Sequence, residues 1–168
     1  NKMKIAFFET ESWEKDYLLS QLKDFDLIFF EEKINSNNLK KISDISVLSP
    51  FVYSVIDKKI IGSLKALKYI ATRSTGFDHI NLKACRNKKI LVSNVPTYGE
   101  NTVAEHTFAL ILDLSRKIYP SLEKTKKGDF SLEGLRGFDL KEKNLGVVGT
   151  GNIGRHVIRI ANGFNMKI

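Results

Sequence analysis

Short apolar runs and amphipathic segments alternate along the first hundred residues of the chain. Five apolar runs are candidate buried strands, at residues 5–8, 27–30, 45–48, 69–71 and 90–92. Strands that alternate with helices predict a parallel sheet with helices on both of its faces. The connections between such strands are expected to be right-handed crossovers.

The segments between these runs carry the periodicity of amphipathic helices. Ser12 can cap the first helix, whose apolar side would consist of Trp13, Tyr17, Leu18, Leu22 and Phe25. A short helical piece is expected at residues 39–42. A longer helix is expected at residues 58–67, with an apolar stripe of Ile60, Ile61, Leu64 and Leu67.

A long and strongly apolar helix is expected at residues 102–119. Thr102 and Glu105 match the capping-box pattern at its start, and Pro120 is expected to end it. Its apolar positions cover more than one face and are Ala104, Phe108, Ile111, Leu112 and Ile118. Such a helix needs partners on several sides, as an interdomain or intersubunit helix does.

The segment after this helix is polar and contains Gly128, Gly134 and Gly137. We expect residues 121–140 to form a connection with no more than one helical turn. The boundary between an N-terminal domain, residues 1–100, and a second part, residues 101–168, is therefore placed near residues 99–103.

A glycine-rich turn, GTGNIG at residues 149–154, joins a candidate strand at 145–148 to a candidate helix. This arrangement is typical of sites that hold the pyrophosphate of a dinucleotide. Gly149 permits the tight turn, Gly151 lets the backbone approach phosphate, and Gly154 lets the helix pack on the strand. The free N–H groups at the start of the helix suit an anion.

An acidic residue about 20 positions downstream would confirm this motif, because it binds the ribose. Residues 166–168 have the pattern of the start of the strand that would carry it. A glycine-rich turn without a ligand therefore stays open as an alternative, and so does the choice between NAD and NADP.

The net charge of +8 raises the question of nucleic-acid binding. The lysines form short pairs in separate segments, at 40–41, 58–59, 88–89 and 126–127, which is typical of a solvated surface rather than of a nucleic-acid site. No apolar run approaches the ~18 residues that a membrane span needs. Lys2 and Lys4 lead directly into the first strand rather than into a secretory signal.

Cys85 is the only cysteine of the chain. An internal disulfide is therefore excluded, and a cysteine-based metal site is not expected. A reduced, cytoplasmic setting fits this composition best.

Ligands of an open parallel sheet bind beyond the carboxyl ends of its strands. Three segments lie there in the predicted sheet, at residues 50–53, 73–78 and 94–99. The second contains Ser74, Thr75 and Gly76, whose successive backbone N–H groups can face a carboxylate. A turn without a ligand is the alternative for these residues.

Three further side chains belong to the same segments. Arg73 can pair with a substrate acid or with a carboxylate such as Asp78, and we favour the structural role. Tyr53 and Tyr98 can line a pocket, or pack with their hydroxyl groups in water.

The histidines are His79, His106 and His156. None has an oriented carboxylate partner in the sequence, as a general acid or base needs. The chain also lacks the H-E-x-x-H and G-x-S-x-G motifs. We therefore assign no catalytic residue and no metal ligand within the chain.

Three stretches together resemble the D-isomer-specific 2-hydroxyacid dehydrogenases, most closely the D-lactate dehydrogenase-like branch. They are TRSTGFDHI at 72–80, NVPTYGENTVAEH at 94–106 and LGVVGTGNIG at 145–154. The likeness covers essentially the whole chain, and the combination of the second and third stretches is far more specific than either alone.

The resemblance implies an α/β fold with a flavodoxin-like parallel-sheet substrate domain at residues 1–100. For residues 101–168 it implies an interdomain helix and then the first strand and helix of a Rossmann NAD-binding domain. The substrate of such enzymes lies between the two domains.

The resemblance also implies roles for particular residues. The backbone of Ser74, Thr75 and Gly76 would hold the substrate carboxylate, and Tyr98 and Tyr53 would border the substrate. Thr102 would lie near the ribose and carboxamide of the nicotinamide. The cofactor's pyrophosphate would meet the glycine-rich turn, at Gly149, Gly151, Asn152, Ile153 and Gly154.

The implied activity is the NAD-dependent interconversion of a D-2-hydroxy acid and a 2-oxo acid of the lactate/pyruvate type, in a homodimer. The family's catalytic Arg, Glu and His are expected downstream of Ile168, so this chain would be an inactive fragment. None of them corresponds to Arg73, Glu105 or His106. Residues 142–144 read Glu-Lys-Asn where the family usually has Gly-Lys-Thr, but the glycines that follow are intact.

Functions of other classes fit the sequence less well. A receiver domain needs Asp after the third strand and Lys after the fifth, where the chain has Ser49-Pro50 and Pro96-Thr97. A flavin carrier needs a phosphate site after the first strand, where the chain has Glu9 and Glu11. The alternative that remains is a non-catalytic binding or oligomerisation fragment of the same fold.

Overall fold

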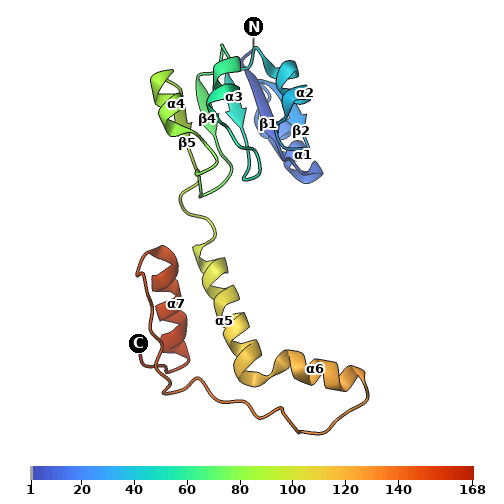
Figure 1. Cartoon of the computed structure of the whole chain (residues 1–168), viewed down its shortest axis with the longest axis vertical. Helices are drawn as coiled ribbons and strands as arrows, with labels where there is room; N and C mark the ends of the chain where they lie inside the picture. Colours follow the sequence, from blue (N-terminus) through green and yellow to red (C-terminus); the bar gives the residue numbers. More distant parts are fainter. Residues whose placement is uncertain (1) are drawn as a thin grey trace. The chain divides into compact units, whose positions relative to one another are not determined.

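The computed structural model describes residues 2–168 and divides them into two compact units (Figure 1). The first unit ends at Thr97, and the second comprises Tyr98–Ile168. Each unit is described by itself below.

The first unit is built on a five-stranded parallel sheet with the strand order β2-β1-β3-β4-β5. Its strands are β1 (Lys4–Phe8), β2 (Asp26–Phe30), β3 (Val47–Ser49), β4 (Tyr69–Ala71) and β5 (Leu91–Ser93). This order is that of flavodoxin-like doubly wound sheets. The parallel α/β architecture predicted from the alternating pattern is thus confirmed.

Helical segments connect these strands. They are α1 (Ser12–Gln21), α2 (Ser36–Leu39), the 3₁₀ turn η1 (Lys40–Ile42), α3 (Lys58–Ser63) and α4 (Leu82–Asn87). The sequence pattern did not predict α4. Its start carries a standard signal, since the Asn81 side chain accepts a hydrogen bond from the Ala84 N–H at 2.9 Å.

The core of the first unit lies around the central strands, where Phe8, Leu48 and Ile70 are fully buried. Phenylalanine rings also stack between β1 and β2. The centroids of Phe7 and Phe29 lie 5.2 Å apart and those of Phe8 and Phe30 4.5 Å apart. Such burial is the main stabilising contribution to a sheet of this kind.

Helix α1 differs from its prediction in two ways. Its N-cap is Glu11 rather than Ser12, and the backbone N–H of Glu11 donates to the Glu14 carboxylate at 2.9 Å. The Glu11 side chain in turn accepts from the backbone N–H of Glu14. This capping box satisfies free N–H groups at the helix start, one residue earlier than a Ser12 cap would. The expected apolar side is not buried either, because Trp13 and Tyr17 are 65% and 62% exposed.

The second unit contains α5 (Glu100–Arg116), α6 (Ile118–Lys126) and α7 (Asn152–Gly163). Helix α5 begins after Gly99, so Thr102 is not its cap. Helices α5 and α7 pack together, and the rings of Phe108 and Phe164 stack with centroids 5.4 Å apart.

The prediction that Pro120 ends the long helix is wrong. Helix α5 ends at Arg116, and Lys117, its C-cap, has a left-handed φ of 57°. Pro120 lies in the first turn of α6, where a backbone N–H has no helical partner to lose. The segment predicted as a connection therefore contains most of a helix.

Residues 145–148 do not form the predicted strand. The only pairing there is an isolated parallel bridge between Asn144 and Lys167, with the Leu145 N–H donating to the Lys167 carbonyl at 2.8 Å. A strand needs a hydrogen-bonded neighbour along its length, and the short 166–168 segment provides one only for its first residues. Val148 is fully exposed as a result.

Candidate functional site

In the turn after β4, residues 74–76, all three carbonyl groups accept hydrogen bonds. The Ser74 carbonyl accepts from the Val95 N–H at 3.0 Å, and the Thr75 carbonyl from the Asn94 side chain at 2.8 Å. The Gly76 carbonyl accepts from the Ser74 hydroxyl at 2.7 Å. Within residues 2–168, no acceptor receives the backbone N–H groups of Ser74, Thr75 and Gly76. A turn with free, neighbouring N–H groups is suited to an anion.

Buried side chains behind this turn fix its shape. Ser74 is 2% exposed, and its hydroxyl lies 2.7 Å from that of Thr72. The Thr72 hydroxyl in turn lies 3.2 Å from Nε2 of His79. Burial lowers the pKa of His79, and the negative charges of Glu9 and Asp78 oppose this shift. His79 is thus linked to the turn through the Thr72 hydroxyl.

Arg73, which precedes the turn, has a structural position. Its guanidinium pairs with Glu14 at 3.2 Å, not with Asp78. It also donates to the carbonyls of Phe8 at 2.7 Å and Ser49 at 2.8 Å. These contacts tie together the carboxyl ends of β1, β3 and β4 and leave few donors for a substrate.

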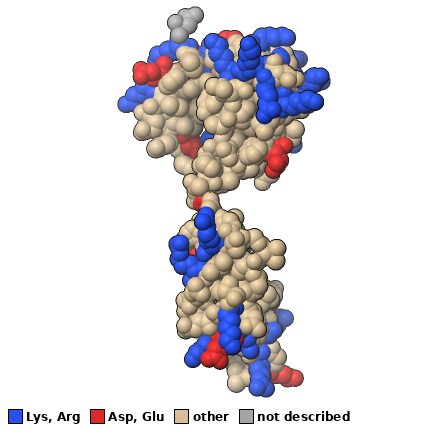
Figure 2. All heavy atoms as spheres, turned by 90° about the vertical axis from the view of Figure 1, so that its left-hand side faces the viewer, with Lys and Arg blue, Asp and Glu red and all other residues tan. Residues whose placement is uncertain are grey.

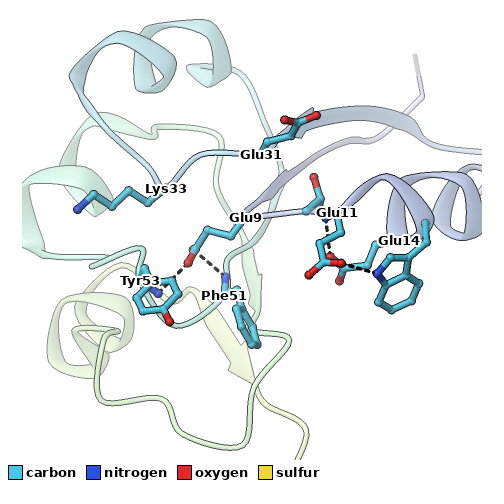
Figure 3. Close-up of a pocket in the computed structure, with 9 residues that line it drawn as sticks. Glu9, Glu11, Glu14, Glu31, Lys33, Phe51 and Tyr53 are labelled. Carbon is cyan, nitrogen blue, oxygen red and sulfur yellow. Dashed lines mark hydrogen bonds between the residues drawn. The ribbon is translucent and has the colours of Figure 1, made fainter. Parts of the chain in front are cut away.

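The carboxylate of Glu9 organises the loop after β3. It accepts hydrogen bonds from the backbone N–H groups of Phe51 at 3.2 Å and Tyr53 at 2.8 Å (Figure 3). It also accepts one from the Ser54 N–H at 3.1 Å. Glu9 adopts a left-handed φ of 59°, which is uncommon for a residue with a side chain. This role could not be predicted from the sequence, because the partners of Glu9 are backbone N–H groups that every residue except proline has.

A pocket of about 590 Å³ opens beside Glu9. Figure 3 shows labelled side chains around it that come from the loops after β1, β2 and β3 and, for Glu14, from the first turn of α1. Its lining residues are Glu9, Thr10, Glu11, Trp13, Glu14, Glu31, Lys33, Phe51 and Tyr53. Tyr53, a predicted substrate neighbour, therefore lies at this pocket, and its side chain is 73% exposed.

At two positions of the 149–154 loop, Gly149 and Gly154, a residue with a side chain would strain the backbone. Gly149 has a φ of +94°. A Cβ atom at Gly154 would lie 2.1 Å from the Gly149 carbonyl oxygen. A Cβ atom at Gly151 would meet nothing within 4 Å, so this backbone is open to an approaching group.

Helix α7 starts directly behind these glycines. Its N-cap is Gly151, and its first turn contains no acidic residue. The Asn152 side chain donates to Glu100 at 3.4 Å and accepts from Arg155 at 2.8 Å. Ile153 is 44% exposed. The open helix start and free space at Gly151 fit the pyrophosphate of a dinucleotide.

The two remaining predicted residues lie at the start of the second unit. Tyr98 is its first residue and is 67% exposed. Thr102 is exposed in the first turn of α5.

Other kinds of site find no support in the part of the chain that the structure describes. There, no three His, Cys, Asp or Glu residues are grouped as a metal site would require. No described helix combines the length and apolar character needed to cross a bilayer. On the face that Figure 2 shows, Lys and Arg side chains form several separate groups on both units.

Residues 5–162 match the family described as "D-isomer specific 2-hydroxyacid dehydrogenase, catalytic domain". The chain belongs to this family. The resemblance noted in the three sequence stretches is thereby confirmed, and the 2-hydroxyacid dehydrogenase fold accounts for the parallel sheet of the first unit.

Two curated relatives and one solved structure illustrate the similarity. The D-lactate dehydrogenase of Escherichia coli is 34% identical over 99% of this chain and 52% of its own length. An aromatic 2-oxoacid reductase of Clostridium sporogenes is 45% identical over 60% of this chain and 30% of its own length. The D-lactate dehydrogenase of Aquifex aeolicus, solved with NAD and lactic acid, superposes with a TM-score of 0.90 at 33% identity, over 96% of this chain and 49% of that one.

The chain spans about half the length of the curated relatives that it matches over 99% of its own residues. Family membership shows that residues 5–162 have the fold of a family of oxidoreductases.

Proposed function

We propose that this chain forms the substrate-binding half, and the start of the cofactor-binding half, of an NAD-dependent D-2-hydroxyacid dehydrogenase. The observation that carries the proposal is the 74–76 turn, whose carbonyls are engaged while its N–H groups are free. Each free N–H can donate to an oxygen of a 2-oxo acid's carboxylate. The domain division is proposed as residues 1–100 and 101–168.

The 149–154 loop is the proposed contact for the pyrophosphate. Its support is the free space at Gly151 together with the exposed start of α7. Bound NADH would supply the hydride that reaches C2 of the 2-oxo acid, while the carbonyl oxygen takes up a proton. Thr102 is assigned to the nicotinamide side, and Tyr98 and Tyr53 to the border of the substrate.

NAD is proposed as the cofactor because the A. aeolicus relative was solved with NAD. We propose a cytoplasmic setting because Cys85, the only cysteine, is a buried free thiol. Pyruvate is the first substrate to test, since the E. coli relative is a D-lactate dehydrogenase.

We further propose that the 168-residue chain alone does not complete this reaction. No residue in it is assigned the transfer of the proton, and His79 is engaged behind the turn. The catalytic Arg, Glu and His of the family are proposed to lie in residues that follow Ile168.

Loss of NADH absorbance in the presence of pyruvate tests both statements. We expect turnover from the full-length gene product and none from the 168-residue chain. Thr75→Pro removes one of these N–H groups and should raise KM by about tenfold, the effect of one charge-assisted hydrogen bond. Turnover by the short chain would contradict the second statement, and none by the full-length product with any 2-oxo acid would contradict the first.

A further inference from the structure

Three side chains beside the 74–76 turn form a continuous series of hydrogen bonds. Nε2 of His79 lies 3.2 Å from the Thr72 hydroxyl, which lies 2.7 Å from the hydroxyl of Ser74. The Ser74 hydroxyl in turn lies 2.7 Å from the carbonyl oxygen of Gly76. Thr72 and Ser74 are only 3% and 2% exposed, so water hardly competes for these bonds. The proposed function uses the backbone of the turn and leaves these side chains without a role.

The number of available protons fixes the direction of these bonds. A carbonyl oxygen can only accept, so the Ser74 hydroxyl donates its one proton to Gly76. The Thr72 hydroxyl must then donate to Ser74, because two oxygen atoms 2.7 Å apart with no proton between them would repel each other. The carbonyl of Pro50, another acceptor near Thr72, is farther away at 3.4 Å. The Thr72 oxygen is left to accept, and the donor is Nε2 of His79.

This direction assigns one tautomer to the ring of His79. Burial lowers the pKa of His79, against the opposing effect of the charges of Glu9 and Asp78, so the neutral ring is the main form near neutral pH. A neutral imidazole carries a single N–H. In His79 that N–H lies on Nε2, and Nδ1 is unprotonated.

The last bond of the series orients a peptide group of the turn. A trans peptide bond is planar, so a carbonyl and the N–H of the next residue point in opposite directions. The Gly76 carbonyl points toward the buried Ser74 hydroxyl, and the Phe77 N–H therefore points away from it. The Ser74 and Thr75 carbonyls, which have other donors, orient the N–H groups of Thr75 and Gly76 in the same manner. Within residues 2–168, no acceptor receives the Phe77 N–H, so it is a further free donor beside the turn.

We propose that His79 is a positioning residue for the anion site at the 74–76 turn. Its Nε2–H begins a one-way series of donors, through Thr72 and Ser74, that holds the Gly76 carbonyl and leaves the Phe77 N–H available to a carboxylate. This rests on the proposed function, because it takes the turn as the carboxylate site. The series operates in both charge states of His79, since the imidazolium also carries a proton on Nε2.

Two pairs of variants of the full-length gene product test the positioning role. His79→Leu and Thr72→Val break the series, whereas His79→Gln keeps an N–H donor and Thr72→Ser keeps the hydroxyl. The substrate is whichever of pyruvate, phenylpyruvate and oxaloacetate the parent reduces best. We expect each breaking variant to raise the KM of this acid about fivefold or more with little change in kcat, because a contact used in both the ground state and the transition state is weakened. The two conservative variants should stay within about twofold of the parent, and the KM of NADH should not change in any of the four.

A double substitution tests whether His79 and Thr72 act as one series. Once the series is broken at one position, a second break has no further effect, so the combination of His79→Leu and Thr72→Val should raise KM no more than either alone. Effects that multiply would show independent contributions and would overturn the inference. An unchanged KM in His79→Leu, or an equal rise in His79→Gln, would overturn it as well and leave the dehydrogenase assignment intact.

NMR of the same protein, labelled with ¹⁵N-histidine, gives a readout that does not require activity. The signals of His79 are those that disappear in His79→Gln. We expect a protonated Nε2, an unprotonated Nδ1, and an Nε2–H proton that moves upfield in Thr72→Val because its acceptor is gone. Protonation of Nδ1 alone, or an Nε2–H signal that Thr72→Val does not move, would overturn the inference. If these signals are as expected but the parent reduces no 2-oxo acid, the proposed function fails and the series of donors stands.

Discussion

At the scale of single residues, one carboxylate shapes the loop that follows β3. Glu9 accepts three backbone N–H groups from residues 42 to 45 positions away in the sequence. The sequence marked Glu9 only as an acid in a loop, because its partners are main-chain groups that any residue provides. By contrast, the 74–76 turn was recognisable, since small residues and a glycine follow a strand end directly.

Replacement of Glu9 by glutamine should destabilise the first unit. The NH₂ of the amide would face backbone N–H donors, with which it cannot form a hydrogen bond. The bonds that remain would be accepted by a neutral oxygen instead of a charged carboxylate. We expect Glu9→Gln to cost about 1–3 kcal/mol in the free energy of unfolding. Urea unfolding followed by Trp13 fluorescence measures this, because Trp13 lies in the first unit.

Glu31→Gln is the matched control, since Glu31 lines the same pocket and no hydrogen bond to it is present among residues 2–168. Its unfolding free energy should stay within about 0.5 kcal/mol of the parent, as for most surface changes. Equal effects of the two substitutions would show that the Glu9 contacts contribute nothing specific.

At the scale of elements, local patterns located the strands well and the helix ends poorly. The predicted strand at residues 69–71 coincides with β4, because alternation and burial act within a few residues. Pro120 was misread as a stop because its effect depends on where a helix begins, which Lys117 decides. The strand predicted at 145–148 depends on neighbours that the local sequence does not contain.

Helix α7 allows a test of close packing at the glycine-rich loop. In Gly154→Ala the new Cβ would meet the Gly149 carbonyl at 2.1 Å, and backbone atoms must move. We expect a loss of roughly 1–3 kcal/mol, typical of overpacking, seen as a lower Tm in far-ultraviolet circular dichroism.

Gly163→Ala, at the other end of α7, is the control because its Cβ would meet nothing within 4 Å. It should be neutral or stabilising by up to about 1 kcal/mol, as alanine favours helix. Equal Tm losses in both variants would mean that helix propensity, not the contact at Gly149, controls this loop.

At the scale of the whole molecule, the second unit leaves many apolar side chains exposed. They are Val103, Leu110, Leu114, Ile118, Tyr119, Leu122, Phe130, Leu132 and Phe138. Surfaces of this kind mark interaction sites. This exposure supports the proposed homodimer, and equally the alternative that the chain acts as an oligomerisation fragment.

Sedimentation equilibrium of the 168-residue chain tests this proposal. We expect a dimer, and Leu114→Asp should shift it toward monomer by about tenfold in Kd or more, because a charge would enter an apolar contact. Leu19→Asp, on exposed α1 of the first unit, should not change the mass. A monomer at every concentration, or equal effects of both substitutions, would contradict the proposal.

The stacked phenylalanines of β1 and β2 have a consequence for sheet alignment. Phe7 stacks on Phe29, and Phe8 stacks on Phe30. Because Phe7 and Phe8 are consecutive, the two pairs lie on opposite faces of the same two strands. A slip of β2 by one position would unstack both pairs at once and send each ring to the wrong side. The edge strand β2 is thus held in a single register against β1. The loop with Glu31 and Lys33, which follows β2, therefore begins at a fixed position along the sheet.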